Sequence, residues 1–308
     1  MSSALILAAG YGTRLRPLTL ELPKPVVPLG DRPLLAHVVA ACRAAGVARL
    51  VANLHHGHEK ISSVISELSL NVEVVVEAEI RGTAGGVAGA RRLFEPGAVL
   101  VWNGDIVVDA PVRQLLAVAN ARDAQVLAVT PRAAGEGTVG IGEDGSLVRL
   151  RGKVYGRETR GGDYLGVMAL GPSVVARLPE RGCLAADVAM PALAAGGKVW
   201  TVPTDAAWSD LGDLPAYVSA NFDWLARYLA GTPAVSRPSA SSWLADTAKL
   251  APGLAVERCL IGAGAELRGA GEVTEVIAWP GAVVSAPLSR AVVLGSGRVV
   301  PFDAAAEN

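Results

Sequence analysis

The chain has 308 residues, a formal net charge of −1 and 51% hydrophobic residues. This length and composition predict one large globular domain plus a smaller one and exclude a disordered protein. The 28 basic residues are balanced by 29 acidic ones. No basic field is available for duplex nucleic acid, so we expect no nucleic-acid partner.

Membrane insertion and secretion are also disfavoured by the sequence. Apolar stretches are broken before they reach the length of a transmembrane helix, as Asp187 and Pro191 break residues 182–197. The N-terminus lacks the basic segment of a signal peptide and runs into a glycine turn. Three widely spaced cysteines favour a reducing compartment. We therefore expect a cytoplasmic protein with no membrane partner.

Short apolar runs alternate with helical patterns along the first half of the chain. The expected strands are 4–9, 50–53, 72–76, 99–102 and 126–129, and the expected helices are 34–45, 59–68, 83–93 and 112–121. Continuous apolar runs are typical of strands buried on both faces. The pattern predicts an α/β fold with a Rossmann-like, three-layer, mostly parallel sheet, whose ligands lie at the carboxyl ends of the strands.

The C-terminal region has a different pattern. Residues 231–251 are loose and rich in Pro and Ser, which predicts a linker between a catalytic domain at 1–230 and a small domain at 252–300. From Gly253 the sequence divides into blocks of six, a period typical of a parallel β-helix. Leu267 and Val273 keep the phase of Ile261, but Ser285 does not. We expect a short, irregular β-helix, with a cluster of edge strands as the alternative. Its open end favours a homo-oligomer.

The first strand leads into a glycine turn followed by two arginines. Gly10 and Gly12 allow backbone N–H groups to approach an anion, and Arg14 and Arg16 carry guanidinium groups suited to phosphate. Lys24 follows between two prolines that hold the backbone stiff. These residues predict a phosphate site; the alternatives are a tight turn and a surface lysine.

Two aspartates are candidates for a metal. Asp105 ends Asn103-Gly104-Asp105 directly after the strand 99–102, and Asp210 lies in Trp208-Ser209-Asp210. Carboxylates at such positions suit Mg²⁺, which is held by one or two carboxylates together with phosphates. Asp213, before Leu214-Pro215, is expected to cap a helix instead.

The other polar and aromatic residues favour structural roles. His55-His56-Gly57-His58 has no cysteine nearby, and zinc requires four ligands. A polar loop that opens the helix 59–68 is therefore favoured over a zinc site. Trp102 and Trp208 are expected to pack under the metal site rather than stack on a base.

Five motifs in a fixed order carry a family resemblance. They are Leu7 to Thr19, Pro23-Lys24-Pro25, Gly82-Thr83-Ala84-Gly85-Gly86, Asn103-Gly104-Asp105 and Trp208-Ser209-Asp210-Leu211-Gly212. Together they resemble the signature of sugar-1-phosphate nucleotidylyltransferases (NDP-sugar pyrophosphorylases), nearest to mannose-1-phosphate guanylyltransferase-like members. The blocks of six resemble the left-handed β-helix appended to many members. Such enzymes join a sugar-1-phosphate to a nucleoside triphosphate and release pyrophosphate.

The resemblance implies a role for each matching residue. Arg14 and Lys24 are the implied catalytic residues, and Asp105 and Asp210 the implied Mg²⁺ ligands. The implied nucleotide-binding residues are Ala8, Ala9, Gly10, Gly12, Thr13, Glu77, Gly82, Thr83, Gly85 and Asn103. Gly104, Lys153, Gly166 and Asp187 are the implied sugar-phosphate residues. Because the attacking group is already an anionic phosphate oxygen, the reaction needs positioning and charge stabilisation rather than a general base.

The nucleobase is expected between the turn Ala8-Ala9-Gly10 and the loop Gly82–Gly86. Glu77 precedes that loop by five residues, and a carboxylate can accept from N1–H and the N2 amino group of guanine. This favours GTP; an exposed carboxylate at a strand end is the alternative. Arg81 stands where guanylyl members usually have leucine.

The acceptor side is less well determined. The chain has no Glu-Lys-Pro motif, which holds the sugar phosphate in many members. Lys153 is the nearest substitute, and Arg151 is its rival. Gly166 matches the sugar-facing glycine, and Asp187 matches an acidic position or caps the following helix.

Three functions remain open. The first is an Mg²⁺-dependent transferase that makes GDP-mannose from mannose-1-phosphate. The second is a transferase of the same class that uses UTP or dTTP and another sugar phosphate. The third is a catalytically silent homologue that binds a nucleotide sugar and regulates a partner. A β-helix acyltransferase would need a catalytic histidine, and no histidine follows His58.

Overall fold

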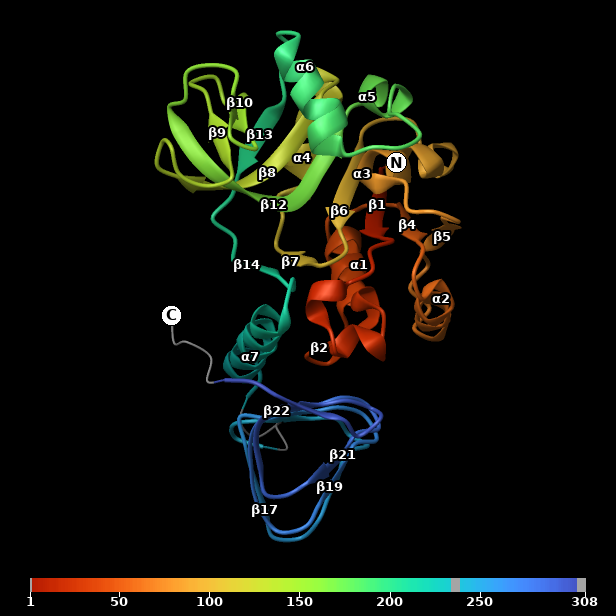
Figure 1. The fold of residues 1–308 in the computed structure, drawn as a ribbon, viewed down its shortest axis with the longest axis vertical. Helices are drawn as coiled ribbons and strands as arrows, with labels where there is room; N and C mark the ends of the chain where they lie inside the picture. Colours follow the sequence, from red (N-terminus) through yellow and green to blue (C-terminus); the bar gives the residue numbers. More distant parts are fainter. Residues whose placement is uncertain (1, 234–238, 304–308) are drawn as a thin grey trace. The chain divides into compact units, whose positions relative to one another are not determined.

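The computed structural model describes residues 2–233 and 239–303, which divide into two compact units (Figure 1). The first contains Met1–Tyr11 and Leu35–Ser209, and the second Gly12–Leu34 and Asp210–Asn308. Residues 234–238, within the predicted linker, lie outside the described residues. Within the described ranges, no helix combines the length and apolar character needed to cross a bilayer.

A ten-stranded sheet forms the centre of the first unit. Its parallel part has the order β6-β1-β4-β5, with bounds β1 Ser3–Ala8, β4 Arg49–Leu54, β5 Glu73–Val76 and β6 Val99–Asn103. The connecting helices are α2 (His58–Glu67) and α3 (Gly82–Ala90), with α1 (Leu34–Ala44) between β1 and β4 and a short turn η4 (Arg91–Leu93) after α3. The predicted strands and helices of this part are confirmed to within a few residues.

The rest of the sheet is mainly antiparallel. It contains β8 (Gln125–Arg132), β9 (Val139–Ile141), β10 (Leu147–Leu150), β11 (Lys153–Val154), β12 (Arg160–Leu170) and β13 (Trp200–Pro203). β12 runs antiparallel to β6, β8 and β9, whereas β13 is parallel to β8. The sheet is therefore mixed rather than mostly parallel. Short turns join β9, β10 and β11, and only antiparallel strands can be joined by such turns.

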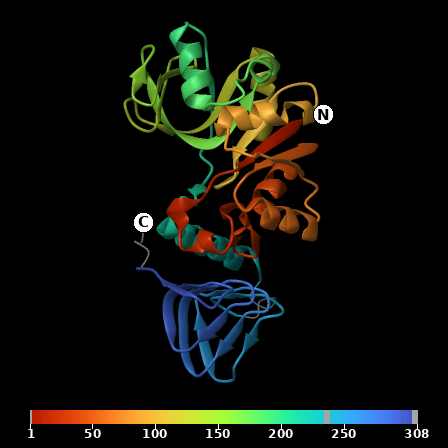
Figure 2. The same ribbon diagram turned by 45° about the vertical axis from the view of Figure 1, so that its right-hand side comes forward.

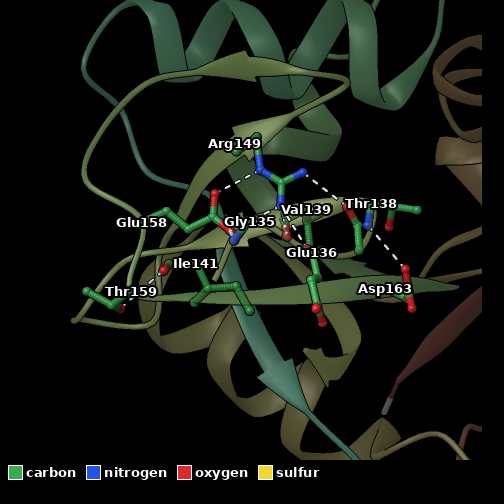
Figure 3. A network of polar contacts seen from close by, with 10 residues as sticks. Gly135, Glu136, Thr138, Val139, Ile141, Arg149, Glu158, Thr159 and Asp163 are labelled. Carbon is green, nitrogen blue, oxygen red and sulfur yellow. Dashed lines mark hydrogen bonds and ion pairs between the residues drawn. The ribbon is translucent and has the colours of Figure 1, made fainter. Parts of the chain in front are cut away.

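A network around Arg149 holds these hairpins together (Figure 3). The Arg149 guanidinium donates to the Glu158 carboxylate at 2.8 Å and to the backbone oxygens of Glu136 and Gly137 at 2.8 and 3.1 Å. The side chains of Arg149 and Glu158 are each only 16% exposed. This pair connects residues 135–139 to β10 and to the segment before β12.

Helices cover the sheet. Side chains of α3, α5 (Pro172–Ala176), η5 (Leu184–Ala189) and α6 (Met190–Ala194) form one apolar cluster with Leu5, Val51, Val99 and Val101 of the sheet. Helix α4 (Val112–Arg122) packs on β6, β8 and β12, with none of its residues in that cluster. Two short strands, β7 (Ile106–Val108) and β14 (Trp208–Asp210), pair with each other.

In the second unit, parallel strands stack into a coil with a triangular outline (Figures 1 and 2). Its strands are β15 Trp243–Leu244, β16 Lys249–Leu250, β17 Leu254–Glu257, β18 Leu260–Ile261, β19 Glu266–Arg268, β20 Gly271–Ala278, β21 Val283–Ser285 and β22 Leu288–Val293. Trp243 pairs with Leu260 and Leu260 with Ile277, so one turn takes 17 residues. An antiparallel strand, β23 (Val299–Pro301), follows β22.

The core of the coil agrees with the predicted six-residue phase. Ile261, Leu267 and Val273 all lie inside its apolar cluster, whereas Ser285 is exposed. Strands β15 and β16 fall within the segment predicted as a linker and pair with β18 and β19. The repeating coil therefore begins before residue 252. Its left-handed sense stays a prediction.

An N-terminal arm belongs to the second unit. It contains three short turns, η1 (Thr13–Leu15), η2 (Leu18–Leu20) and η3 (Lys24–Val26), and the hairpin β2 (Pro28–Leu29) and β3 (Arg32–Pro33), and it lies against α7 (Leu214–Gly231). The Tyr217 hydroxyl donates to the Pro28 oxygen at 2.8 Å and accepts from the Trp279 indole at 2.9 Å. Gly30 has φ +59°, and a Cβ there would lie 2.1 Å from Trp224. Only glycine fits this contact.

Candidate active site

Strand pairing brings the two predicted nucleotide motifs of the first unit to one edge of the sheet. Leu7 pairs with Asn53 on one side and with Asn103 on the other, so these three strands end at the same level. The Gly104 N–H donates to the Leu7 oxygen at 2.9 Å, and a Cβ on Gly104 would lie 2.6 Å from that oxygen. A glycine is required where Asn103-Gly104-Asp105 leaves β6 beside the end of β1.

Asp105 lies in a short turn supported by a tryptophan. Trp102 is buried, and its indole N–H donates to the Ile106 oxygen at 3.0 Å across the turn. Asp105 is half-buried. Gly166 of β12 has φ +70°, and a Cβ there would lie 2.5 Å from the Ile106 side chain and 3.2 Å from Asn103 Nδ2. The structure thus brings Gly166 next to the turn that carries Asp105.

Trp102 packs as predicted, but Trp208 does not. Trp208 is 36% exposed and therefore not buried under a site. The apolar cluster around Leu5 and Val51 does not include it.

A chain of buried polar contacts lies behind the turn Ala8-Ala9-Gly10. Asn53 Oδ1 accepts from the Ala8 N–H at 3.2 Å, and Asn53 Nδ2 donates to Glu77 Oε1 at 2.8 Å. Glu77 Oε2 accepts from the Arg81 N–H at 3.0 Å. Glu77 is only 3% exposed, so its alternative reading as an exposed strand-end carboxylate is wrong. Both of its oxygens already hold protein donors, so it connects the ends of β1, β4 and β5 to the start of α3.

The motif Gly82–Gly86 forms the first turns of α3, so the base loop expected there is helical, in agreement with the predicted helix 83–93. Gly82 has φ +75°, and a Cβ there would lie 2.4 Å from the Gly182 oxygen. A Cβ on Gly85 would lie 2.6 Å from the Glu180 oxygen. These glycines let α3 pack closely against residues 180–182.

The arm of the second unit brings together the basic residues and one aspartate. A Cβ on Gly12, which has φ +62°, would lie 3.1 Å from Cβ of Lys24, and the Thr19 hydroxyl donates to the Gly12 oxygen at 2.8 Å. A Cβ on Gly212 would lie 3.0 Å from Arg14 Nη1 and 3.3 Å from Asp210 Oδ1. Arg14 and Asp210 therefore lie beside each other, and both are exposed.

Asp213 caps α7, as predicted. Its side chain accepts from the Ala216 N–H at 3.0 Å. This contact gives Asp213 a structural role, so Asp210 stays the candidate ligand of this motif.

The acceptor-side residues come from a hairpin turn and a helix start. Lys153 is exposed on β11, and Arg151 lies in the turn before it with φ +51°. Asp187 Oδ2 accepts from the Cys183 N–H at 2.7 Å, directly before η5. Asp187 lies inside η5 and bonds back to the residue before that helix, so it does not cap a helix that begins at Val188.

The histidine cluster makes aromatic and backbone contacts. His55 Nδ1 lies 2.8 Å from the backbone oxygen of Glu77, and His55 Nε2 lies 3.4 Å from the Tyr11 hydroxyl. The Tyr11 and His55 rings meet edge to face at 5.6 Å. In the part of the chain that the structure describes, no group of three or more His, Cys, Asp or Glu side chains is arranged to hold a metal ion.

Comparison with known proteins indicates a family. Residues 3–153 match the model of the nucleotidyl transferase family. This segment is therefore similar to members of that family. The matched segment runs from β1 to β11 and includes the glycine turn and Asn103-Gly104-Asp105.

Curated relatives are similar to this chain over more of its length. The mannose-1-phosphate guanyltransferase of Schizosaccharomyces pombe is 29% identical over 78% of this chain and 69% of its own. The mannose-1-phosphate guanylyltransferase of Mycobacterium tuberculosis is 29% identical over 86% of this chain and 76% of its own. A probable mannose-1-phosphate guanylyltransferase of Arabidopsis thaliana is 30% identical, and the match spans 63% of that protein.

A solved structure confirms the fold. HddC from Yersinia pseudotuberculosis, crystallised in complex with GMP-PN, aligns with a TM-score of 0.61 over 73% of this chain and all of its own. Sequence identity is 22%. The likeness therefore concerns the fold.

Sequence reasoning missed three side chains in this region. Asn53 connects β1 to Glu77, while Tyr164 and Cys183 lie near the acceptor-side residues. The signals were weak: Tyr164 stands two residues before Gly166, and Cys183 directly before a helix. Tyr164 and Cys183 become candidate site residues only through contacts with residues that are far from them in sequence.

Proposed function

We propose that this chain joins a sugar-1-phosphate to a nucleoside triphosphate and releases pyrophosphate, with mannose-1-phosphate and GTP as its substrates. The observation that supports this most is the placement of Asp105 and Gly104 beside the end of β1, at the edge where parallel strands bind ligands. The names of the curated relatives support the same reaction and substrates.

In the proposed reaction, an oxygen of the sugar phosphate attacks the α-phosphorus of the nucleotide. The new P–O bond forms as the bond to the β-phosphate oxygen breaks, and pyrophosphate leaves with the electron pair. Because the nucleophile is already anionic, the chain has to align the two phosphates and reduce their repulsion. Arg14 and Lys24 supply positive charge for this purpose.

We assign the remaining nucleotide contacts to backbone and small side chains. These are Ala8, Ala9, Gly10, Gly12, Thr13 and Asn103, together with Gly82, Thr83 and Gly85 at the start of α3. Glu77 supports this surface through Asn53 and Arg81. The acceptor contacts are assigned to Gly104, Gly166 and Asp187, with Lys153 and Arg151 as the two rival phosphate ligands.

Asp105 and Asp210 suit Mg²⁺ as ligands. Both are carboxylates, one half-buried at the carboxyl edge of the sheet and the other exposed beside Arg14. Hard oxygen donors of this kind, one or two per ion, are what Mg²⁺ uses when it also binds phosphates. When bound, the ion would neutralise charge that develops on the phosphate oxygens.

We extend the proposal to the setting of the enzyme. The coil is assigned a left-handed sense by its resemblance to the family. It is also assigned a role in forming a homo-oligomer, because the strands at its open end have unpaired edges. The three free cysteines fit a reducing cytoplasm.

The test is pyrophosphate release by the purified protein with Mg²⁺. GTP, UTP, dTTP, ATP and CTP are each paired with mannose-, glucose- and N-acetylglucosamine-1-phosphate. We expect the highest kcat/KM with GTP and mannose-1-phosphate. A preference for UTP or dTTP would retain the reaction and reject the substrate. Nucleotide-sugar binding with no turnover in any pair would support the regulatory homologue instead.

A further inference from the structure

Cys183 is fixed against the start of α3 by backbone contacts on both sides. The Gly182 N–H donates to the Arg81 oxygen, and the Ala84 N–H donates to the Gly182 oxygen, each at 2.9 Å. One residue further, the Leu184 N–H donates to the Thr83 hydroxyl at 2.8 Å. Cys183 therefore lies beside the glycine motif of α3 in a defined position.

The thiol of Cys183 differs from the other two thiols of the chain. Cys183 is half-buried, whereas Cys42 and Cys259 are fully buried. Burial raises the pKa of Cys42 to about 12 and that of Cys259 to about 11. Reactivity follows the thiolate fraction and access, so both of these thiols should be inert.

At Cys183 the balance is reversed. Burial raises its pKa, but the N–H groups of Ala186 and Ala185, the Thr83 side chain and the Arg151 charge together lower it below the ordinary thiol value. A lowered pKa gives an accessible thiol a larger thiolate fraction, and with it a higher reactivity, than an ordinary thiol.

A second observation concerns Tyr164 on β12. Its hydroxyl oxygen is buried and has no hydrogen-bond partner within residues 2–233 and 239–303. Burial raises the pKa of Tyr164, and the charges of Asp105 and Cys183 raise it further, so the ring lies within electrostatic reach of both. A buried hydroxyl without a partner costs free energy unless something else supplies the hydrogen bond.

These two side chains lie among the residues assigned to the acceptor. Tyr164 is two residues from Gly166, and the Arg151 charge reaches Cys183 from the turn before Lys153. A tyrosine hydroxyl both donates and accepts, which suits a sugar hydroxyl. The guanidinium of Arg151 suits the phosphate of the same molecule.

We propose that Tyr164 and Cys183 border the sugar-phosphate side of the site, and that Cys183 is a modification site for soft electrophiles which a bound sugar phosphate shields. This rests on the proposed function. With a small disulfide, the Cys183 thiolate forms a new S–S bond, the old S–S bond breaks, and one thiolate leaves with the electron pair. With iodoacetamide, an S–C bond forms and iodide leaves.

The first experiment measures where and how fast iodoacetamide reacts with the full-length protein. Peptide mass spectrometry follows Cys42, Cys183 and Cys259 over time, the two buried thiols serving as internal controls. We expect Cys183 to react at least about tenfold faster than either control. Equal rates at all three cysteines would overturn the proposal.

The second experiment measures protection. Mannose-1-phosphate at about ten times its KM should slow the alkylation of Cys183 about tenfold, while GTP without the sugar phosphate should slow it much less. Protection by GTP alone to the same extent would place Cys183 on the nucleotide side and contradict the proposal. In activity assays, Cys183→Ser should lose its sensitivity to the reagent, each protein being compared with its own untreated sample.

The third experiment tests the hydroxyl of Tyr164. Tyr164→Phe should raise the KM for the sugar phosphate about three- to tenfold, the effect of one hydrogen bond, and leave the KM for GTP unchanged. Tyr155→Phe is the matched control, because Tyr155 also has a buried hydroxyl without a partner in the described ranges but directly follows β11 instead of lying on β12 near Gly166. Equal effects of the two variants would overturn the role of Tyr164.

Failure of this inference and failure of the proposed reaction give different results. Turnover with GTP and mannose-1-phosphate but no protection of Cys183 rejects the inference and retains the reaction. Protection of Cys183 by a sugar phosphate without turnover in any pair supports the binding side and rejects the reaction.

Discussion

The parallel and antiparallel parts of the sheet in the first unit place their functional residues in different ways. In the parallel part, backbone register sets the positions: Leu7 lies between Asn53 and Asn103, and Gly104 follows at a contact that only glycine allows. In the antiparallel part, side chains hold the hairpins, with Arg149 and Glu158 at the centre. Local sequence motifs therefore predict the residue positions in the parallel part. In the antiparallel part, the positions depend on contacts between residues that are far apart in sequence.

The largest effect is expected at the edge of the parallel part. Asp105→Asn should lower kcat about 10²- to 10³-fold, because it removes a charged ligand from the centre of the proposed reaction. Steady-state pyrophosphate release measures the change. The control is Asp109→Asn, an exposed carboxylate four residues along the same segment, which should keep activity within about twofold. Comparable losses in both variants would contradict a specific role for Asp105.

In the antiparallel part, the largest effect should be on stability. Arg149→Ala should lower the free energy of unfolding by about 2–3 kcal/mol, because it removes the guanidinium donors of the Glu158 carboxylate and of three backbone oxygens. Urea denaturation measures this. Arg132→Ala removes a more exposed ion pair with Asp163, with Arg132 48% exposed, and should cost less than about 1 kcal/mol. If the two variants lost equal stability, the hairpins would not depend on the Arg149 network.

The same network predicts a pH dependence. A hydrogen bond from Arg149 lowers the pKa of Glu158 in the folded state. The pair therefore stabilises the fold fully above the ordinary glutamate pKa of about 4.3, and this contribution is lost as the pH falls through the lowered folded value. In unfolding titrations between about pH 7 and 3, wild type should lose more stability than Arg149→Ala. Parallel curves would contradict the linkage.

The contrast explains which parts of the structure could be predicted from sequence. Strands β1 and β6 are continuous apolar runs, and a turn with glycine follows each of them. Both strands could therefore be located from the sequence, and with β6 also Asp105. The antiparallel order of β12 could not, because it depends on pairing with β6, β8 and β9 at once. Residues 243–250 were read as a linker because their strands have only two residues each and are stabilised by the next turn of the coil.

Glu77 shows the same limit within the parallel part. Its position at the end of a strand was readable, but its burial and its two donors were not, because Asn53 is 24 residues away. Glu77→Gln replaces one acceptor oxygen by a donor that faces either Asn53 Nδ2 or the Arg81 N–H. We expect a loss of about 1–3 kcal/mol in unfolding free energy.

A nucleotide assay separates this structural role from contact with a base. In Glu77→Gln, the preference for GTP over UTP in kcat/KM should stay within about threefold of wild type, because the Glu77 oxygens are already engaged. A large drop in that preference would show that Glu77 contacts the base. Glu73→Gln, on the exposed part of the same strand, should change neither quantity.

The smallest effect distinguishes Arg151 from Lys153, two cations on one hairpin of which the sequence favours Lys153. The charge of Arg151 acts on the Cys183 thiol and lowers its pKa. Arg151→Ala should raise the KM for the sugar phosphate about three- to tenfold and slow alkylation of Cys183, because loss of the positive charge raises the thiol pKa. Lys153→Ala should alter KM less than about twofold and leave alkylation unchanged. The reverse ranking would make Lys153 the phosphate ligand, and the antiparallel part would then follow the sequence motif after all.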